Sequence, residues 1–389
     1  MSRSCRGFSL VDLVVILALL VVMVCLLFPA LGTSRDASRR SGCINNLKQL
    51  GLALHNFHDA HNRFPGSNDV PLLEKPDASW KKVPLHTPAK PAPDIDRAQH
   101  GTNFSWMARI TPYMEETSVH KWLDMVNRRA WDPCEDNPID PETEQPASLA
   151  LPCHPIAWRA TIDSFRCPDA RTDDFCKANP QAGIDKNPYD PKTVYGPAGL
   201  TNYVALGATH SDSLMGVEKN QFAGGKRHPN GTLFPGGKIG IDDMTDGSSN
   251  TFMVCETIEP TLAAWYEGST AAVFGLAGKP KFEQTDVVGS NYGVPAEGTK
   301  TTLNRGNAAA NPKEFYLAAG QQGIPWLHGP SSHHWGGIVN HLLGDGSARG
   351  VKDKIDPKLY MHLITRSGRE PVNAFFEENK PTWFERLFR

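Results

Sequence analysis

The chain has 389 residues, and its 40 lysines and arginines nearly balance 42 aspartates and glutamates, for a formal net charge of −2. This balance supplies no global basic field that would hold a nucleic acid, so we expect no nucleic-acid partner. The length allows two or three domains, or one domain with large insertions. The 34 glycines and 31 prolines exclude a long helical bundle for most of the chain and indicate a loop-rich body that can still fold.

One segment near the N-terminus is much more apolar than the rest. Sixteen consecutive apolar residues run from Leu13 to Phe28, and Pro29, Ala30 and Leu31 extend this run. A helix needs about 20 such residues to cross a bilayer. The sequence therefore predicts one transmembrane helix over 8–31.

Several kinds of N-terminal processing compete for this region. A secretory signal peptide could be cut near Ala30-Leu31-Gly32, but its apolar part would normally span only about 7 to 15 residues. A lipoprotein would use Cys25, but Val24 stands where a small residue is expected. A third possibility places the junction at Gly7-Phe8, and an uncleaved signal anchor is the fourth.

The next segment keeps a helical period outside the predicted membrane span. Ile44, Leu47, Leu50, Leu54 and Phe57 recur at spacings of three and four, which predicts that the helix continues over 32–62 as an amphipathic extension. Its apolar stripe needs a sheet on which to pack. Proline and glycine at 65 and 66 end the helix.

The remaining residues, 63–389, predict an α+β head, in which an antiparallel β-sheet carries the long helix. Proline-rich stretches near 66–100, 131–160 and 177–200 are expected to be insertions. Two short helical pieces surround Pro112. Strands are predicted at 162–166, 201–206, 251–256, 263–266 and 338–343. Asp345-Gly346 indicates a hairpin turn, and a last helix is predicted from Asp356-Pro357 to Gly368.

Several motifs together resemble one bacterial family. They are Arg6 to Asp12, Asn45 to His58, Trp106 to Glu115, Phe165 to Pro168, Asp246 to Thr251, and His334 to Gly337 leading to Asp345 to Ser347. In this order they resemble prepilin-type, pseudopilin-like proteins that combine an N-terminal cleavage and methylation segment with a domain of unknown function. That domain ends in a signature of His, nine residues and Asp-Gly, and it is sometimes filed as a solute-binding domain.

The resemblance implies how the N-terminus is processed. A prepilin peptidase would cut after Gly7, remove a leader of residues 1–7 and methylate the new N-terminal Phe8. Asp12 would take the acidic position that neutralises the amine of a neighbouring subunit inside lipid, where a lone charge is costly. The partners implied are this peptidase, membrane lipid, and further copies or other pilin-like subunits. Aspartate is one methylene shorter than the glutamate of the family pattern.

The C-terminal signature departs from the family pattern by one residue. Ten residues rather than nine separate His334 from Asp345, which predicts a bulge beside the hairpin.

The eight cysteines suggest disulfides. Cys5 lies in the leader and Cys25 in the span, and six cysteines remain in the body, enough for fifteen pairings. Because Cys43 and Cys167 fall in the family's motif positions, the resemblance implies a bridge between them. Cys134 with Cys153, inside one insertion, is the second expected pair, and buried free thiols are the alternative.

Candidate chemical sites are few. His333, His334 and His341 with Asp345 suggest a metal site or an acid–base pair, or else side chains that hold a hairpin together with Gly336, Gly337 and Gly346. Asp242, Asp243 and Asp246 form a weak calcium candidate, with solvated turn residues as the other interpretation. Because no catalytic motif accompanies them, we expect neither a cofactor nor an enzymatic activity.

Two functions remain for a protein of this kind. The first is a non-enzymatic, membrane-anchored structural or assembly protein, and the second is an anchored solute- or carbohydrate-binding module. Positive charges after the span, such as Arg35, Arg39 and Arg40, outnumber Arg3 and Arg6 before it, which favours a cytoplasmic body. The leader pattern and the body cysteines favour export. We expect a single-pass protein of the bacterial cytoplasmic membrane with an extracytoplasmic body.

Overall fold

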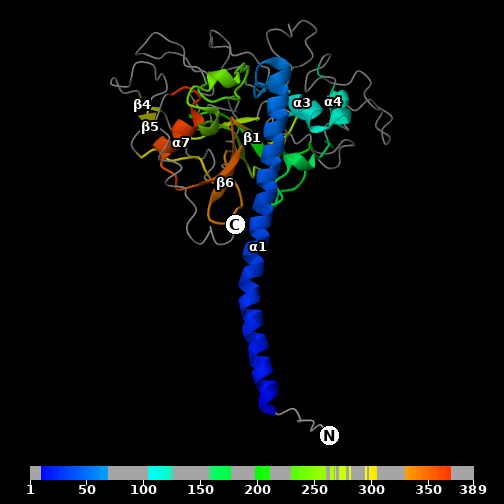
Figure 1. Ribbon diagram of the computed structural model, residues 1–389. Helices are drawn as coiled ribbons and strands as arrows, with labels where there is room; N and C mark the ends of the chain where they lie inside the picture. Colours follow the sequence, from blue (N-terminus) through cyan, green and yellow to red (C-terminus); the bar gives the residue numbers. More distant parts are fainter. Residues whose placement is uncertain are drawn as a thin grey trace, which may run out of the picture.

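The computed structural model is an α+β structure in which one long helix carries a head (Figure 1). It describes residues 10–68, 104–123, 125, 157, 159–176, 198–210, 229–259, 263–266, 268, 271–276, 280–281, 294–295, 298–304 and 329–368. The expected leader, Phe8, the Cys134–Cys153 pair and most of the three proline-rich insertions lie outside the described residues.

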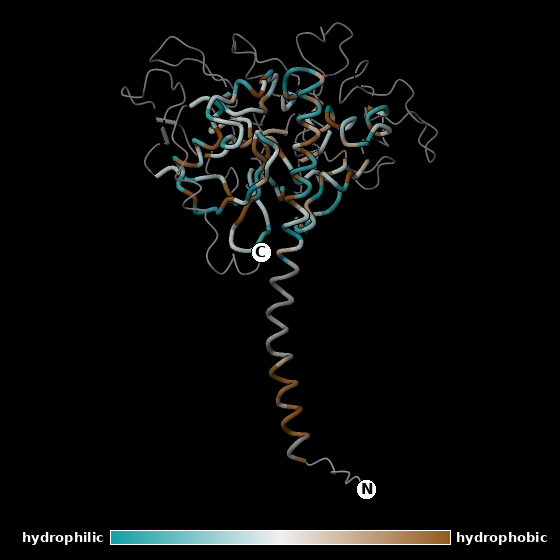
Figure 2. Tube along the Cα trace, viewed as in Figure 1, coloured by the Kyte–Doolittle hydropathy of each residue, from teal (hydrophilic) through white to brown (hydrophobic). Residues whose placement is uncertain are grey.

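Helix α1 spans Leu10–His61, which is 52 residues, or about 78 Å at 1.5 Å per residue. Its N-terminal part projects away from the head (Figures 1 and 2). The large apolar residues from Leu13 to Met23 are each 45–61% exposed. Among the residues that the structure describes, no helix is both long enough and apolar enough to span a membrane.

The C-terminal half of α1 is part of the core of the head. Leu47, Leu50 and Leu54 are fully buried and Phe57 is nearly so, as the apolar period predicts. Cys43 and Ala53 widen this buried stripe. The helix ends at His61, and Asn62 adopts a left-handed φ of 54° that turns the chain back along the head.

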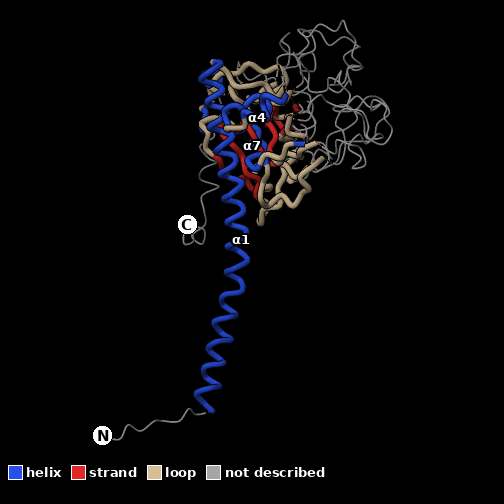
Figure 3. The backbone as a smooth tube through the Cα atoms, turned by 90° about the vertical axis from the view of Figure 1, so that its right-hand side faces the viewer, coloured by secondary structure: helices blue, strands red, loops and turns tan. Residues whose placement is uncertain are grey.

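Five strands form the sheet on which α1 packs (Figure 3). The strands are β1 (Tyr203–Ala208), β2 (Phe252–Glu256), β3 (Ala272–Phe274), β6 (Ile338–Leu343) and β7 (Ala348–Lys352), in the order β3-β1-β2-β6-β7. All neighbours pair antiparallel except β1 and β3, which are parallel. We expected an antiparallel sheet, but the sheet is mixed. The reason is that β3 does not pair with β2, which precedes it in the chain, but lies on the far side of β1 and runs parallel to it.

Both faces of this sheet are buried. Alternating residues point to opposite sides: Ala205, Val254 and Leu342 belong to the core cluster that contains the α1 stripe. Val204, Phe252 and Val339 belong to a second cluster with helix α7 (Pro357–Ile364). Helix α7 begins after its cap Asp356, whose carboxylate accepts from the Leu359 N–H, as the sequence predicts.

Short elements complete the described head. Helix α3 (Trp106–Ile110), the 3-10 turn η1 (Thr111–Met114) and helix α4 (Thr117–Leu123) are the pieces predicted around Pro112, and α3 and η1 contact α1. The others are the 3-10 turns η2 (Asp163–Phe165), η3 (Ile241–Asp243) and η4 (Ser248–Asn250), and a small sheet of β4 (Pro280–Lys281) with β5 (Val294–Pro295).

Two predicted strands are wrong. The segment 162–166 contains the 3-10 turn η2 instead of a strand. The Phe165 and Arg166 N–H groups bond to carbonyls three residues earlier in the chain and need no neighbouring strand. In 263–266, only Ala264 makes a β-bridge, to Leu200. The apolar residues there, which include the fully buried Trp265, pack into the core without a ladder.

The β6–β7 hairpin turns at the predicted position. The Gly346 N–H donates to the Leu343 carbonyl, and Gly346 has a left-handed φ of 81° that favours glycine. A register shift is present beside the hairpin, but the extra residue belongs to β2, since Phe252 and Val254 pair with the consecutive residues Leu343 and Leu342. Strand β6 pairs with β7 in unbroken register.

The α1 stripe offers a matched pair of substitutions. Leu50→Asp places an unpaired carboxylate in the core and should lower the free energy of unfolding by about 4 kcal/mol or more, enough to release or unfold the head. Leu52, two residues away, is 65% exposed, so Leu52→Asp should change it by less than about 0.5 kcal/mol. Urea denaturation of both variants measures this difference. Equal stabilities would mean that the stripe does not pack on the sheet.

Candidate functional site

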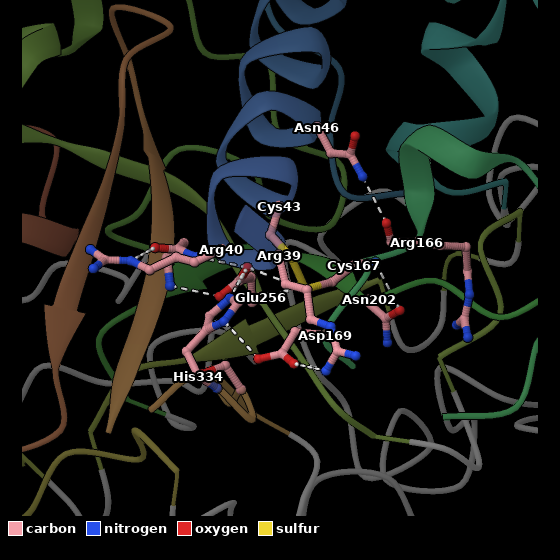
Figure 4. Close-up of a disulfide and its surroundings, with 12 residues drawn as sticks. Arg39, Arg40, Cys43, Asn46, Arg166, Cys167, Asp169, Asn202, Glu256 and His334 are labelled. Carbon is pink, nitrogen blue, oxygen red and sulfur yellow. Dashed lines mark hydrogen bonds and ion pairs between the residues drawn. A yellow bond between two sulfur atoms is a disulfide. The ribbon is translucent and has the colours of Figure 1, made fainter. Parts of the chain in front are cut away.

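A disulfide joins α1 to the head. Cys43 and Cys167 are bonded, with 4.9 Å between their Cα atoms and a sequence separation of 124 residues, as the family resemblance implies. Figure 4 shows the bridge at the side of α1 that faces the head. Closing so long a loop typically contributes about 2 to 4 kcal/mol, mainly by restricting the unfolded chain.

Hydrogen bonds reinforce this junction from both sides. The Asn46 amide on α1 donates to the Arg166 carbonyl over 2.7 Å, and the Tyr203 hydroxyl of β1 donates to the Cys43 carbonyl over 3.2 Å. The Cys167 N–H donates to Asn202 Oδ1 over 3.1 Å. The backbone on each side of the bridge is therefore fixed independently of the sulfur–sulfur bond.

A buried histidine lies beside the disulfide, between two carboxylates. His334 Nδ1 is 3.0 Å from Asp169 Oδ2, and His334 Nε2 is 3.1 Å from Glu256 Oε1. All three side chains are only 2% exposed. Cys167 Sγ lies 3.7 Å from Glu256 Oε1 and 3.9 Å from His334 Nε2. The bridge and this charged cluster are one site (Figure 4).

The remaining carboxylate oxygens also have partners. Glu256 accepts from the Asn340 N–H over 2.8 Å and from the Asn340 side-chain amide over 2.9 Å. Arg39 on α1 approaches Asp169 Oδ1 at 3.4 Å. Two buried carboxylates thus face one arginine and one histidine, which balances their charge if the histidine is protonated.

The electrostatics favour the protonated histidine. Burial alone would lower the pKa of His334, but hydrogen bonding and charge attraction from Glu256, followed by those from Asp169, outweigh it and raise this pKa above 6.5. In the oxidised protein both ring nitrogens then donate, one to each carboxylate. Removing any one of the three would leave a buried charge without its partner.

Local structure explains how distant segments meet here. Glu256 is the last residue of β2, and Asn340 lies in the adjacent strand β6. His334 precedes Gly336 and Gly337, which both have left-handed φ angles, 82° and 70°. A Cβ at Gly337 would lie 2.5 Å from Asp353 Oδ2. Glycine is therefore needed for the turn that places His334 beside the disulfide.

The other histidines of the predicted cluster lie elsewhere. His333 is exposed. His341 is on the α7 side of β6, 2.8 Å from the Tyr360 hydroxyl and 3.0 Å from the Val339 carbonyl, and burial lowers its pKa to about 3. Asp345 accepts from the Ser347 N–H in the hairpin turn. The structure therefore does not gather His333, His341 and Asp345 around His334.

The three aspartates of the calcium candidate act separately. Asp243 accepts from the Gly240 N–H at η3, and Asp246 accepts from the Gly368 N–H. Among the described residues, one group of three or more potential metal ligands converges, and none of these three aspartates belongs to it. That group is Cys43, Cys167, Glu256 and His334, whose ligand atoms all lie within 4.8 Å of one another.

Sequence reasoning missed Asp169, Glu256, Asn340 and Arg39 as members of a site. A usable signal was present at Glu256, because a carboxylate that ends an otherwise apolar strand is buried only when it is paired. Asp169 follows Cys167-Pro168 closely, but nothing local links it to residue 334.

Side chains 24–35 within α1, and those of Val11 and Asp12, are outside the description, so Asp12 is placed only by its backbone in the helix.

The charge on His334 makes stability depend on pH. Its folded pKa lies above the 6.5 of an ordinary histidine, so its stabilisation is complete below about pH 6.5 and is lost as the pH rises through the folded pKa. His334→Gln can hydrogen bond but cannot carry charge. The difference in unfolding free energy between the natural protein and this variant should therefore shrink on going from pH 6 to pH 9. A pH-independent difference, measured in chelator-containing buffer, would contradict the ion-pair description.

Comparison with known proteins identifies a family but not an activity. The family model described as "Protein of unknown function (DUF1559)" matches residues 33–358, more than four fifths of the chain. Neither a curated protein nor a solved structure gives a significant match. The matched region contains both cysteines of the bridge and all members of the buried charged cluster. The chain belongs to the DUF1559 family, which is filed with solute-binding-like proteins and has no assigned function.

Proposed function

We propose that this protein is a non-enzymatic, membrane-anchored, pseudopilin-like structural or assembly protein. The observation that carries the proposal is the form of α1, which is one continuous helix with two differently exposed parts (Figure 2). Its C-terminal part packs one face into the head. Its N-terminal part projects and exposes apolar side chains around its whole circumference.

The exposed apolar side chains of this projecting part support contact with lipid or with other helices. Leu13, Val14, Val15, Ile16 and Leu17 are consecutive, so they point in all directions around the helix, and each is about half exposed. Burying one such side chain contributes roughly 1.5 to 3 kcal/mol. A helix that is apolar all round is stable only when apolar matter surrounds it, in a bilayer or among other helices.

The disulfide supports an extracytoplasmic head. Disulfides persist in oxidising compartments and are rare in the cytoplasm, and the Cys43–Cys167 geometry joins two elements that the fold already brings together. The positive charges after the predicted span favour a cytoplasmic head, but two of them have a structural role within the head. Arg39 pairs with Asp169, and Arg40 donates to Asn340 over 3.4 Å. We therefore give the disulfide more weight than the charge count.

Processing by a prepilin peptidase predicts the mature N-terminus. The mature chain should begin at Phe8, N-methylated, and Gly7→Leu should remain uncleaved because a bulky side chain then precedes the scissile bond. Mass spectrometry of the membrane-extracted protein distinguishes these forms. An intact Met1 in the natural protein, or a terminus after Gly32, would exclude this processing.

Orientation is tested at the other end of the chain. A reporter that is active only in the cytoplasm, fused after Arg389, should give no signal, whereas one that requires an oxidising compartment should be active. The opposite pair of results would place the head in the cytoplasm.

If the protein assembles with other subunits in the membrane, Asp12 should be needed for that assembly but not for the stability of the head. Asp12→Asn should abolish crosslinking between copies in the membrane, because the amine of a neighbouring copy loses its partner in lipid. Asp12→Glu should retain crosslinking, and both variants should keep the melting temperature of the head. If the natural protein does not crosslink to itself or to another pilin-like subunit, the assembly role is excluded.

The second candidate is an anchored solute- or carbohydrate-binding module. The filing of the family with solute-binding-like proteins favours it. It shares the anchored helix and the extracytoplasmic head with the first candidate. Two results together would support this candidate. The protein would stay monomeric in the membrane, and in a thermal-shift panel of sugars and peptides one sugar would raise the melting temperature of the head.

A further inference from the structure

The atoms beside the disulfide have the composition of a zinc site. Two sulfurs, one imidazole nitrogen and one carboxylate oxygen converge from Cys43, Cys167, His334 and Glu256. Cys43, His334 and Glu256 are buried, and Cys167 is partly buried. Zinc prefers four ligands of these kinds in tetrahedral geometry, and a buried site in which all four come from the protein is typical of structural zinc.

The distances between the ligand atoms fit this geometry apart from the bonded sulfurs. With ordinary zinc bond lengths, tetrahedral ligands lie about 3.4 Å apart for nitrogen and oxygen and about 3.6 Å apart for sulfur with either one. The observed separations are 3.1 Å from His334 Nε2 to Glu256 Oε1, 3.7 Å from Cys167 Sγ to that oxygen, and 3.9 Å from Cys167 Sγ to Nε2. All four ligand atoms, Cys43 Sγ included, lie within 4.8 Å of one another. The two sulfurs must separate to about 3.8 Å once their bond is broken.

Neighbouring side chains hydrogen bond to these ligands and orient them, as such neighbours do in zinc proteins. Asp169 lies 3.0 Å from His334 Nδ1, so it fixes the ring with Nε2 directed toward the sulfurs, as in carboxylate–histidine–zinc triads. Two donors of Asn340 hold the Glu256 carboxylate. The backbone hydrogen bonds at Cys43 and Cys167 do not involve the sulfur–sulfur bond, so the two cysteines stay in place after reduction.

We propose that the reduced protein binds one zinc ion through Cys43, Cys167, His334 and Glu256, so that zinc and the disulfide are alternative links between α1 and the head. The first step is reduction: a phosphine takes an oxygen atom from water and becomes its oxide, and the disulfide becomes two thiols. Zinc then displaces both thiol protons and the Nε2 proton of His334. Reoxidation of the two thiolates to the disulfide, by a disulfide-bearing oxidant that is itself reduced to thiols, releases the ion.

The experiment uses the full chain in detergent, reduced with a phosphine and then freed from it, with Zn²⁺ and Co²⁺ as probes. Reduced protein should bind one Zn²⁺ tightly, and Co²⁺ should give the visible absorption of a tetrahedral thiolate site. Oxidised protein should give neither signal. His334→Gln keeps all eight cysteines and should weaken Zn²⁺ binding by at least about 100-fold, and Asp169→Asn by about 10- to 100-fold.

Two variants control for the other thiols and for general effects on folding. His333→Gln changes the exposed neighbour of the ligand, and Cys255→Ala removes a buried thiol on the α7 side of the sheet. Both should bind as the natural protein does, and circular dichroism checks that every variant is folded. If reduced protein takes up no zinc, or if folded His334→Gln binds zinc as tightly as His333→Gln, the site is excluded.

Discussion

The packing of one face of α1 against the sheet is the constraint that the rest of the head satisfies. Leu47, Leu50 and Leu54 are wholly buried, whereas the apolar side chains from Leu13 to Met23 on the same helix are exposed. The strands present Ala205, Val254 and Leu342 to that face. Since their opposite face would otherwise be open to water, α7 covers it and forms a second core. The two core layers of the head thus follow from the burial of one face of the C-terminal part of α1.

The buried charges beside the disulfide place a strict geometric requirement on the fold. Desolvating Asp169 and Glu256 is expensive, and paired buried ions often do no better than apolar residues of the same size. Their arrangement is demanding, however, because His334 must reach both carboxylates at once. This requirement joins the segment after η2, the end of β2 and the turn before β6, which lie far apart in sequence. An alternative packing of α1 would leave at least one of these charges unpaired.

Sequence reasoning succeeded where the signal is local or periodic and failed where it depends on distant partners. The spacing of Leu47, Leu50 and Leu54 is enough to place the buried face, and Ile338 to Leu343 is a strand as predicted. Strand β3 was not predicted, because its three residues become a strand only through parallel pairing with β1. The Cys43–Cys167 bridge came from the family resemblance. Its charged neighbours were missed, because Asp169 and Glu256 are 87 residues apart in sequence and no local pattern indicates their common contact with His334.

The position of the site along α1 explains why the strongest links lie there. Going from the N-terminus, the helix first projects freely, then meets the head at Arg39, Arg40 and Cys43, and only afterwards buries its apolar stripe. Any displacement of the projecting part relative to the head acts first on this end. Apolar contacts can be lost one after another from an end, because each contributes only a few kcal/mol. The disulfide at Cys43 prevents stepwise loss that starts from this end, so displacement of the projecting part does not peel the stripe from the sheet.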